Sequence, residues 1–162
     1  MACRAWTPAQ RFVLRFFVLL WFLSVALWVT ALHQSLGPLQ ATIASAAVQI
    51  ARVAGSQASA SNDLIRAGTL LIEINHECTG VFVLFIFAAF VLAYPARPRW
   101  RLVGLIAGVA LLSLVNVVRL AMLVRLAELW PSSFEYFHEY VWQGIFLGMT
   151  VFAALYWARS SD

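Results

Sequence analysis

Four long apolar segments divide the chain, at about 12–32, 79–94, 102–118 and 141–157. A helix needs about 20 residues to cross the hydrocarbon core of a bilayer, with roughly 17 as a lower limit. The pattern therefore predicts four membrane-spanning helices in a single membrane domain that comprises residues 1–162. The first segment is too long for the apolar part of an ordinary signal peptide, so we expect it to be a retained anchor.

The polar stretch between the first two segments, 33–77, carries two further patterns. Apolar residues recur at helical spacing, which predicts an amphipathic helix with one apolar stripe. That stripe comprises Leu39, Ile43, Ala46, Ile50 and Val53. Later, Ile72, Ile74 and His76 alternate with polar residues, which is the period of a short strand. The turn-like Arg66-Ala67-Gly68 before them predicts a short β-hairpin. The predicted fold is thus an all-α polytopic membrane protein whose extracytoplasmic loop holds an amphipathic helix and a short hairpin.

Composition agrees with a membrane protein and argues against a soluble domain. The chain is 63% hydrophobic and only 11% charged, whereas soluble domains carry about 25% charged residues. The net charge of +4 could suggest nucleic acid as a partner, but the arginines cluster beside apolar segments, where they report topology instead. We therefore expect membrane lipids as partners and no nucleic acid.

The arginine clusters also predict an orientation. Those near the N-terminus and in the link between the second and third spans should be cytoplasmic, because positive residues favour that side. These are Arg4, Arg11, Arg15, Arg97, Arg99 and Arg101. The loops 33–77 and about 119–140 then face outward. Arg119 and Arg125 fall on the side that the rule disfavours, which leaves them either snorkelling to headgroups or serving a function.

Three reactive side chains are predicted within about one helical turn of the outer interface. Cys78 opens the second span, Arg119 closes the third, three residues after Asn116, and His138 precedes the fourth. A histidine can take a thiol proton and return it to a leaving amine. An arginine is always charged and suits an oxyanion. The positive charges and the helix N-terminus should also raise the thiolate fraction of Cys78. Together the three groups could perform acyl transfer.

Other interpretations of the same residues remain open. Cys78 could be a packing residue, and His138 could be an interfacial hydrogen-bonding group. His76, two residues before the thiol, could be the base if this segment is a strand. A zinc site from His33, His76, Cys78 and His138 lacks paired-ligand spacing. Cys3 is predicted on the opposite membrane face, so Cys78 should be a lone thiol.

The motifs "ECTG" at the start of one span, "NVVR" at the end of the next and a histidine before the following one resemble the exosortase/archaeosortase family. These are membrane-embedded cysteine transpeptidases, and the resemblance covers roughly Leu64 to Trp157. It implies that Cys78 is the nucleophile, Arg119 the essential arginine and His138 the histidine of a triad. Gly80 and Asn116 match motif positions of supporting residues. The chain is closest in size to short bacterial forms such as exosortase H.

The resemblance also implies a function in protein sorting. The substrates would be exported proteins with a C-terminal tail composed of a short signature motif, a transmembrane helix and a basic cluster. A thioester would form at Cys78 and pass to an unknown acceptor, such as an amine on a lipid or glycan, with no cofactor or metal. The site would face the periplasm from the bacterial inner membrane. The alternatives are hydrolysis by an intramembrane-edge cysteine protease, and a non-enzymatic assembly or export factor.

Overall fold

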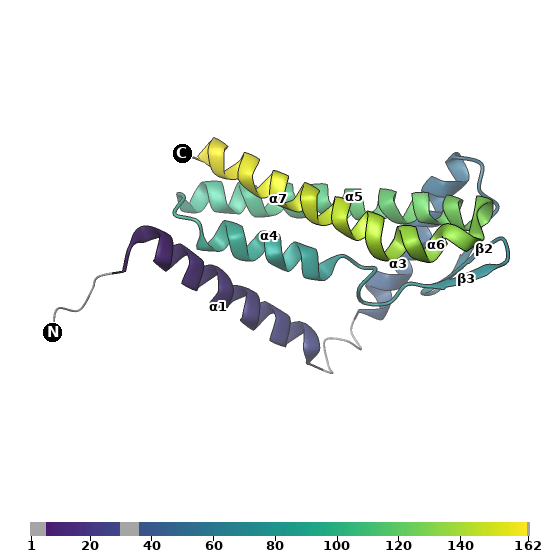
Figure 1. Cartoon of the computed structure of the whole chain (residues 1–162), viewed down its shortest axis with the longest axis horizontal. Coiled ribbons are helices and arrows are strands. Elements are labelled where there is room, and N and C mark those ends of the chain that lie inside the picture. The colour runs from purple at the N-terminus through teal and green to yellow at the C-terminus, as the bar shows by residue number, and fades with distance from the viewer. Residues whose placement is uncertain (1–5, 30–35, 162) are drawn as a thin grey trace.

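The computed structural model describes residues 6–29 and 36–161 and is mostly helical (Figure 1). Helix α1 (Pro8–Trp28) begins behind Thr7, whose hydroxyl accepts from the Gln10 backbone N–H at 3.2 Å while the Gln10 side chain accepts from the Thr7 N–H at 2.9 Å. This reciprocal capping box fixes the start of the helix. The helix thus begins four residues before the start of the predicted span at residue 12, and residues 30–32 of that span lie outside the described part.

Three further long helices complete the bundle: α4 (Val81–Ala93), which packs on α1, α5 (Pro98–Leu129) and α7 (Trp142–Ser161). In the described residues, three helical stretches are long and apolar enough to cross a membrane: Pro8–Trp28, Pro98–Leu129 and Pro131–Ser161. Helix α4 is equally apolar, but its 13 residues extend only about 20 Å at 1.5 Å per residue. The chain is therefore a helical membrane protein with three full-length apolar helices and one shorter one.

The expected outer loop 119–140 is wrong, because α5 continues as a helix to Leu129. Buried residues continue past Arg119 at helical spacing, at Leu120, Leu123, Val124 and Ala127. The helix therefore keeps one packed face well beyond the predicted end of the span. Three short helical turns follow and lead directly into α7: η1 (Pro131–Ser133), α6 (Phe134–Tyr136) and the π-helical η2 (Phe137–Val141).

Helix α3 (Gly37–Val53) is the helix predicted in the 33–77 region, but its buried face differs from the predicted stripe. Of the five stripe residues only Ile43 is buried, and Val53 is 92% exposed. The buried face consists instead of Ile43, Ala44, Ala47, Val48 and Ala51. Small alanine side chains allow close approach to α5, against which α3 packs.

An antiparallel sheet of order β1-β2-β3 follows α3. Its strands are β1 (Ser59–Ser61), β2 (Leu64–Ala67) and β3 (Leu70–Glu73). Gly68, at φ +58°, turns the chain between β2 and β3. The strand alternation expected to reach His76 therefore ends at Glu73, and residues 75–80 form turns instead. We refer to α3 and the sheet together as the cap.

Two ion-paired residues on the extended part of α5 hold the cap. Arg125 pairs with Glu128 at 2.7 Å and also donates to the Gly55 carbonyl at 3.3 Å. Glu128 accepts from the Ser56 hydroxyl at 2.8 Å and from the Gln57 backbone N–H at 3.0 Å. Arg125 is thus engaged within the protein, which corrects the expectation that it might snorkel to headgroups.

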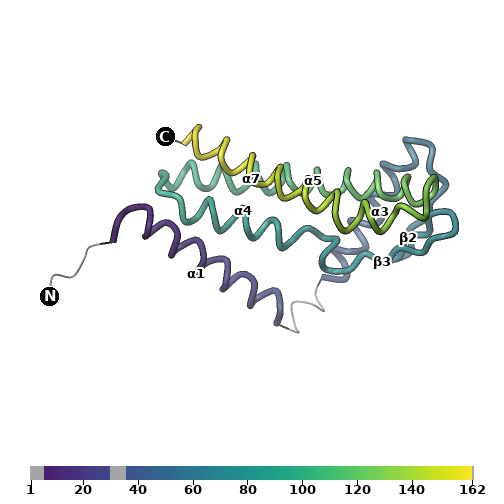
Figure 2. The backbone as a smooth tube through the Cα atoms, in the orientation of Figure 1, coloured from purple at the N-terminus to yellow at the C-terminus, as the bar shows by residue number. Residues whose placement is uncertain are grey.

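The bundle has two different ends (Figure 2). The N-terminal end of α1, the C-terminal end of α7 and the link between α4 and α5 lie at one end, and the cap lies at the other. The first end carries Arg11, Arg97, Arg99, Arg101 and Arg159. Arg4 and Cys3, which the sequence prediction also assigned to that side, lie outside the described residues.

Packing between the helices leaves α1 at the edge of the bundle. Helix α1 packs on α4, whereas α7 packs on both α4 and α5. Glycines bring α5 close to its neighbours, because a Cβ at Gly104 would collide with Trp157 and one at Gly108 with Phe87. Close approach through small residues is typical of membrane helix interfaces.

Candidate active site

Cys78 lies in the tight turn that joins β3 to α4. Its backbone N–H approaches two oxygens of Asn75, the carbonyl at 3.1 Å and the side-chain Oδ1 at 3.0 Å. An Asn side chain that accepts from the backbone of the following residues stabilises such a turn. The Thr79 hydroxyl donates to the His76 carbonyl at 2.5 Å. The conformation of the turn, and with it the position of the sulfur, is therefore fixed by hydrogen bonds on either side.

Gly80 ends this turn and is the N-cap of α4. Its φ of +73° lies in the left-handed region, which glycine adopts without the penalty that a Cβ brings. A Cβ here would also lie 3.1 Å from Asn116 Cγ and 3.2 Å from the Phe146 ring. Gly80 therefore lets the turn carrying Cys78 rest directly against α5 and α7, which is a specific reason for glycine at this position.

His138 approaches the thiol from a distant part of the chain. Its Nε2 lies 3.6 Å from Cys78 Sγ, within hydrogen-bonding distance for sulfur. The residue belongs to the π-helical turn η2, and such turns are frequent at functional sites. Its ring stacks on Phe134, with the centroids 5.5 Å apart and 8° between the planes. This stacking holds the imidazole in the orientation that turns Nε2 toward the sulfur.

Asn116 and Arg119, one turn apart on α5, reach the same turn from the other side. The Asn116 side-chain amide donates to the Cys78 carbonyl at 2.9 Å. Its oxygen accepts a long contact from Arg119 Nη1 at 3.5 Å. Both side chains are buried, at 2% and 5% exposure. Asn116 thus connects the guanidinium to the backbone of the nucleophile candidate.

The Arg119 guanidinium is only partly satisfied by its surroundings. Its Cζ lies 5.7 Å from the centre of the Phe146 ring, a cation–π contact. Its Nε is buried and has no hydrogen-bond partner among the described residues. A buried charge is costly unless it is paired and hydrogen-bonded. The guanidinium therefore keeps hydrogen-bonding capacity that the described residues do not use.

Burial governs the protonation of the thiol. Cys78 is 3% exposed and borders a small apolar space between the sheet and α5, shared with Ile65, Ile74, Leu120 and His138. Burial raises the pKa of Cys78 above its ordinary value, and the positive charge of Arg119 offsets only part of this effect. Arg119 thus acts in the direction expected of a positive charge, but burial outweighs it, and the raised pKa favours the protonated thiol near neutral pH.

The arrangement suits general-base activation of a neutral thiol. If Nδ1 carries the proton of the neutral imidazole, Nε2 is free to accept the proton of Cys78. The sulfur can then attack an acyl carbon while the proton moves to His138. Arg119 can stabilise negative charge on the acyl oxygen but cannot exchange protons. The geometry is therefore compatible with acyl transfer.

The structure brings His138 rather than His76 to Cys78. His76 and Glu77 lie in the turn before Cys78 and line a separate groove, which they share with Arg119. For a metal, the described residues hold no group of three His, Cys, Asp or Glu side chains arranged to bind one. Of the four residues considered for zinc, His33 lies outside the described part.

Three contact residues of the site were not anticipated from the sequence: Asn75, Phe134 and Phe146. Asn75 could have been found, because asparagine is a common turn residue whose side chain accepts hydrogen bonds from nearby backbone N–H groups. Phe134 stands four residues before His138, a spacing that stacks side chains on one helical face. Phe146 has no comparable signal, because one more phenylalanine in an apolar helix does not stand out.

The sequence of the chain matches the model of a known protein family. The family model described as transmembrane exosortase (Exosortase_EpsH) matches residues 2–157. No curated protein and no solved structure gave a significant match. The family match covers nearly the whole chain and includes all the residues of the site described above. The chain therefore belongs to the transmembrane exosortase family.

Proposed function

We propose that this chain is a membrane cysteine transpeptidase that cleaves the C-terminal sorting tail of exported proteins. The family suggests a membrane protein-sorting transpeptidase. The observation that carries the proposal is the 3.6 Å approach of Cys78 Sγ to His138 Nε2, beside the buried Arg119. These groups come from three separate parts of the chain, which is more than packing of a lone cysteine would require.

In the first half-reaction, Cys78 Sγ attacks a backbone carbonyl of the tail and transfers its proton to His138. Arg119 balances the negative charge that develops on the carbonyl oxygen. The C–N bond then breaks, and His138 returns the proton to the departing amine. The products are a thioester on Cys78 and a released tail that consists of the transmembrane helix and its basic end.

In the second half-reaction, an acceptor nucleophile resolves the thioester. His138 takes a proton from the acceptor as its nitrogen or oxygen attacks the acyl carbon. The C–S bond breaks, and the proton returns to the sulfur. One acyl bond has then been exchanged for another. An amine on a lipid or glycan carrier is a suitable acceptor, whereas water in its place would make the enzyme a protease.

We further propose that the site faces the periplasm from the bacterial inner membrane. The arginines at the end opposite the cap support this orientation, because positive residues favour the cytoplasmic side. The peptide bond that precedes the transmembrane helix of a sorting tail would then lie at the level of Cys78. At this level the substrate chain leaves the lipid and becomes accessible to the enzyme.

The test is processing of a tailed protein from the same genome, co-expressed with the enzyme and followed by its size. Cys78→Ala and Cys78→Ser should abolish processing, and His138→Ala should slow it by about 100-fold or more, as for loss of a general base. The comparison variant is His76→Ala, which removes the rival imidazole and should slow processing far less than His138→Ala, because the imidazole within hydrogen-bonding distance of the thiol is that of His138.

Each alternative predicts a different result. Processing by the Cys78→Ala enzyme at the wild-type rate would remove Cys78 as the nucleophile. An equal loss in His76→Ala and His138→Ala would contradict the assignment of the base. Mass spectrometry of the new C-terminus separates transfer from hydrolysis, because a free carboxylate identifies water as the acceptor. A tailed protein that the wild-type enzyme leaves intact would favour a non-enzymatic assembly or export factor.

A further inference from the structure

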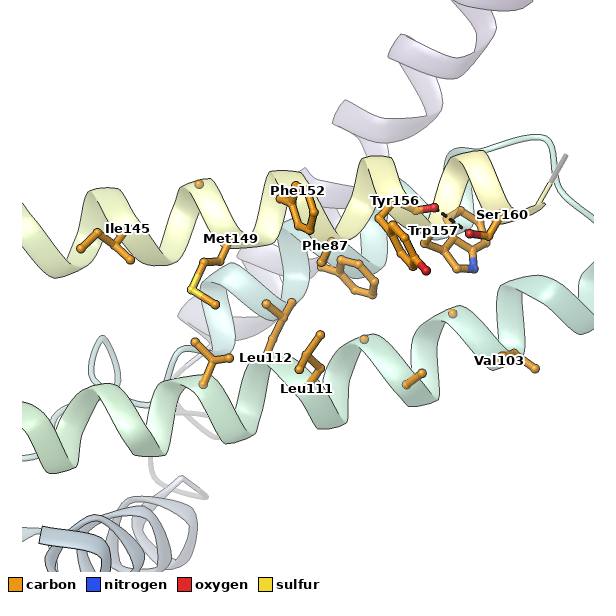
Figure 3. A pocket seen from close by; sticks show the side chains of 16 residues that line it. Phe87, Val103, Leu111, Leu112, Ile145, Met149, Phe152, Tyr156, Trp157 and Ser160 are labelled. Carbon is orange, nitrogen blue, oxygen red and sulfur yellow. Dashed lines mark hydrogen bonds between the residues drawn. The ribbon is translucent and has the colours of Figure 1, made fainter. Parts of the chain in front are cut away.

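Two large grooves run along the helices, and they differ in polarity. The α5–α7 groove, of about 770 Å³, is lined almost entirely by apolar residues and glycines (Figure 3). The second, which we call the α1–α4–α7 groove, has about 640 Å³ and lies between the C-terminal end of α1, the first turns of α4 and the N-terminal part of α7. Arg119 lines only the second of these two grooves.

The second groove has a polar end and an apolar end. Beside Arg119, its polar end carries His76, Glu77 and Gln143. Toward the middle of the bundle its walls become apolar, through Phe82, Val83 and Ile86 of α4 and Leu147 of α7, and Leu27 at the C-terminal end of α1 adds an apolar side. This change in polarity along one groove matches a polypeptide that passes from the aqueous interface into lipid.

Arg119 gives the groove a recognition group that is not satisfied within the protein. A guanidinium has five N–H donors, yet the contacts of Arg119 within the described residues are the 3.5 Å approach to Asn116 and the Phe146 ring. Its Nε is buried without a partner in the same part of the chain. Arg119 also lines the groove, so a backbone carbonyl in the groove would supply an acceptor for its guanidinium.

We propose that the α1–α4–α7 groove binds the segment of the sorting tail that joins the scissile peptide to its transmembrane helix, with a backbone carbonyl at Arg119. The first turns of the substrate helix lie along Phe82, Ile86 and Leu147. Asn116 contacts both the guanidinium and the Cys78 carbonyl, so a carbonyl bound at Arg119 lies next to the turn that carries the nucleophile. This inference rests on the proposed function, since it assigns a place to that substrate.

Two glycines on α7 provide a matched pair of variants. Gly144 lines the α1–α4–α7 groove and Gly148 lines the α5–α7 groove. A Cβ at either position would meet open space. Gly144→Phe and Gly148→Phe therefore place the same side chain on the same helix, one turn apart, and each fills a different groove with no steric clash at Cβ.

Gly144→Phe should lower processing of a tailed protein by at least about tenfold, because displacement of the substrate by about 1 Å can cost up to about a hundredfold. Gly148→Phe should stay within about twofold of wild type. The opposite ranking, or equal effects of both variants, would overturn the assignment. The amount of monodisperse enzyme after purification in detergent is compared for both variants, so that a folding defect is identified separately.

A binding measurement keeps the groove testable without turnover. In the Cys78→Ala enzyme, a photoreactive benzophenone amino acid replaces Leu147 in one enzyme and Met149, which lines the α5–α7 groove, in another. Irradiation with an epitope-tagged tailed protein should give a cross-linked product from position 147 and none from position 149.

Cross-linking from 149 alone, or only lipid adducts at 147 in the mass spectrum, would overturn the proposal. Cross-linking at 147 together with an intact tail in wild-type cells would instead count against the transpeptidase function while retaining the groove.

Discussion

At the residue scale, the candidate site combines a buried thiol with an imidazole that ring stacking holds in position. Cysteine enzymes often lower the pKa of their thiol with adjacent positive charge. Here the effect of burial exceeds that of Arg119, and the pKa of Cys78 lies above its ordinary value. This direction agrees with the proposed mechanism, in which Cys78 is activated at the moment of attack by proton transfer to His138.

This reasoning predicts how alkylation of Cys78 depends on pH. With Cys3→Ser as background, Cys78 is the only thiol, and its reaction with iodoacetamide can be followed by intact mass. A raised pKa means that the thiolate forms only at higher pH, so the rate should still be rising at pH 9. The unfolded enzyme in denaturant is the control, and its rate should level off above its thiol pKa, which is about 8.5 in unperturbed peptides. A folded-state rate that levels off below pH 8 would instead indicate a preformed thiolate–imidazolium pair.

At the element scale, the sequence predicted which segments are helices better than where they end or which face they bury. The end of α5 was predicted too early because Arg119 and Arg125 were interpreted as the polar end of a span. Both residues are accommodated within the protein, Arg119 by burial and Arg125 by Glu128. The buried face of α3 was mispredicted because alanine contributes little to a hydrophobic stripe, yet its small size favours close helix packing.

The pairing of Cys78 with His138 was within reach of sequence reasoning, because topology alone limits which residues share a membrane face. The supporting contacts were not, since they depend on backbone details such as the turn at Asn75 and the π-helical turn at His138. Sequence patterns can locate the boundary of a span to within a few residues. Prediction of the 3.6 Å contact between Cys78 and His138 would require the backbone path of every turn between them.

The junction between the Cys78 turn and α4 yields a prediction about Gly80. Gly80→Ala adds a methyl group in a left-handed conformation and also crowds Asn116 and Phe146. Gly55→Ala is the matched control, because Gly55 has φ +85° but open space around its Cβ. The control should lose only the backbone penalty of about 1–2 kcal/mol.

Gly80→Ala should lose about 1–3 kcal/mol more, as expected for overpacking. Unfolding of the purified protein in detergent by increasing SDS measures the difference. Processing should fall only in Gly80→Ala, because displacement of Asn116 removes its hydrogen bond to the Cys78 carbonyl. Equal destabilisation by the two substitutions would mean that the turn can move away from α5 and α7 without cost.

At the scale of the whole molecule, arginines serve different purposes at the two ends. At the cap, Arg52 Nε donates to the Ala58 carbonyl at 3.0 Å, Arg125 pairs with Glu128 at 2.7 Å, and Arg119 is buried. At the opposite end, Arg97 and Arg99 are exposed, while Arg101 donates to the Tyr94 carbonyl at 2.9 Å. Charges that remain in water near the ends of spans are the ones that determine orientation. Two arginines of the cap, Arg52 and Arg66, are also exposed, but more exposed arginines lie at the opposite end, at Arg11, Arg97, Arg99 and Arg159, which supports the proposed assignment of that end to the cytoplasm.

Orientation can be measured with single cysteines introduced at the two ends of a Cys3→Ser, Cys78→Ser enzyme. Ser59 on β1 and Ser160 near the end of α7 are both exposed, so Ser59→Cys and Ser160→Cys should each give a reactive thiol. A membrane-impermeant maleimide added to intact spheroplasts should label the first variant and spare the second, because only the cap faces the periplasm in the proposed orientation. Permeabilised cells, in which both should react, provide the control for thiol accessibility. Labelling of Ser160→Cys alone in intact spheroplasts would place the cap and Cys78 on the cytoplasmic side, where an exported substrate could not present its tail after translocation.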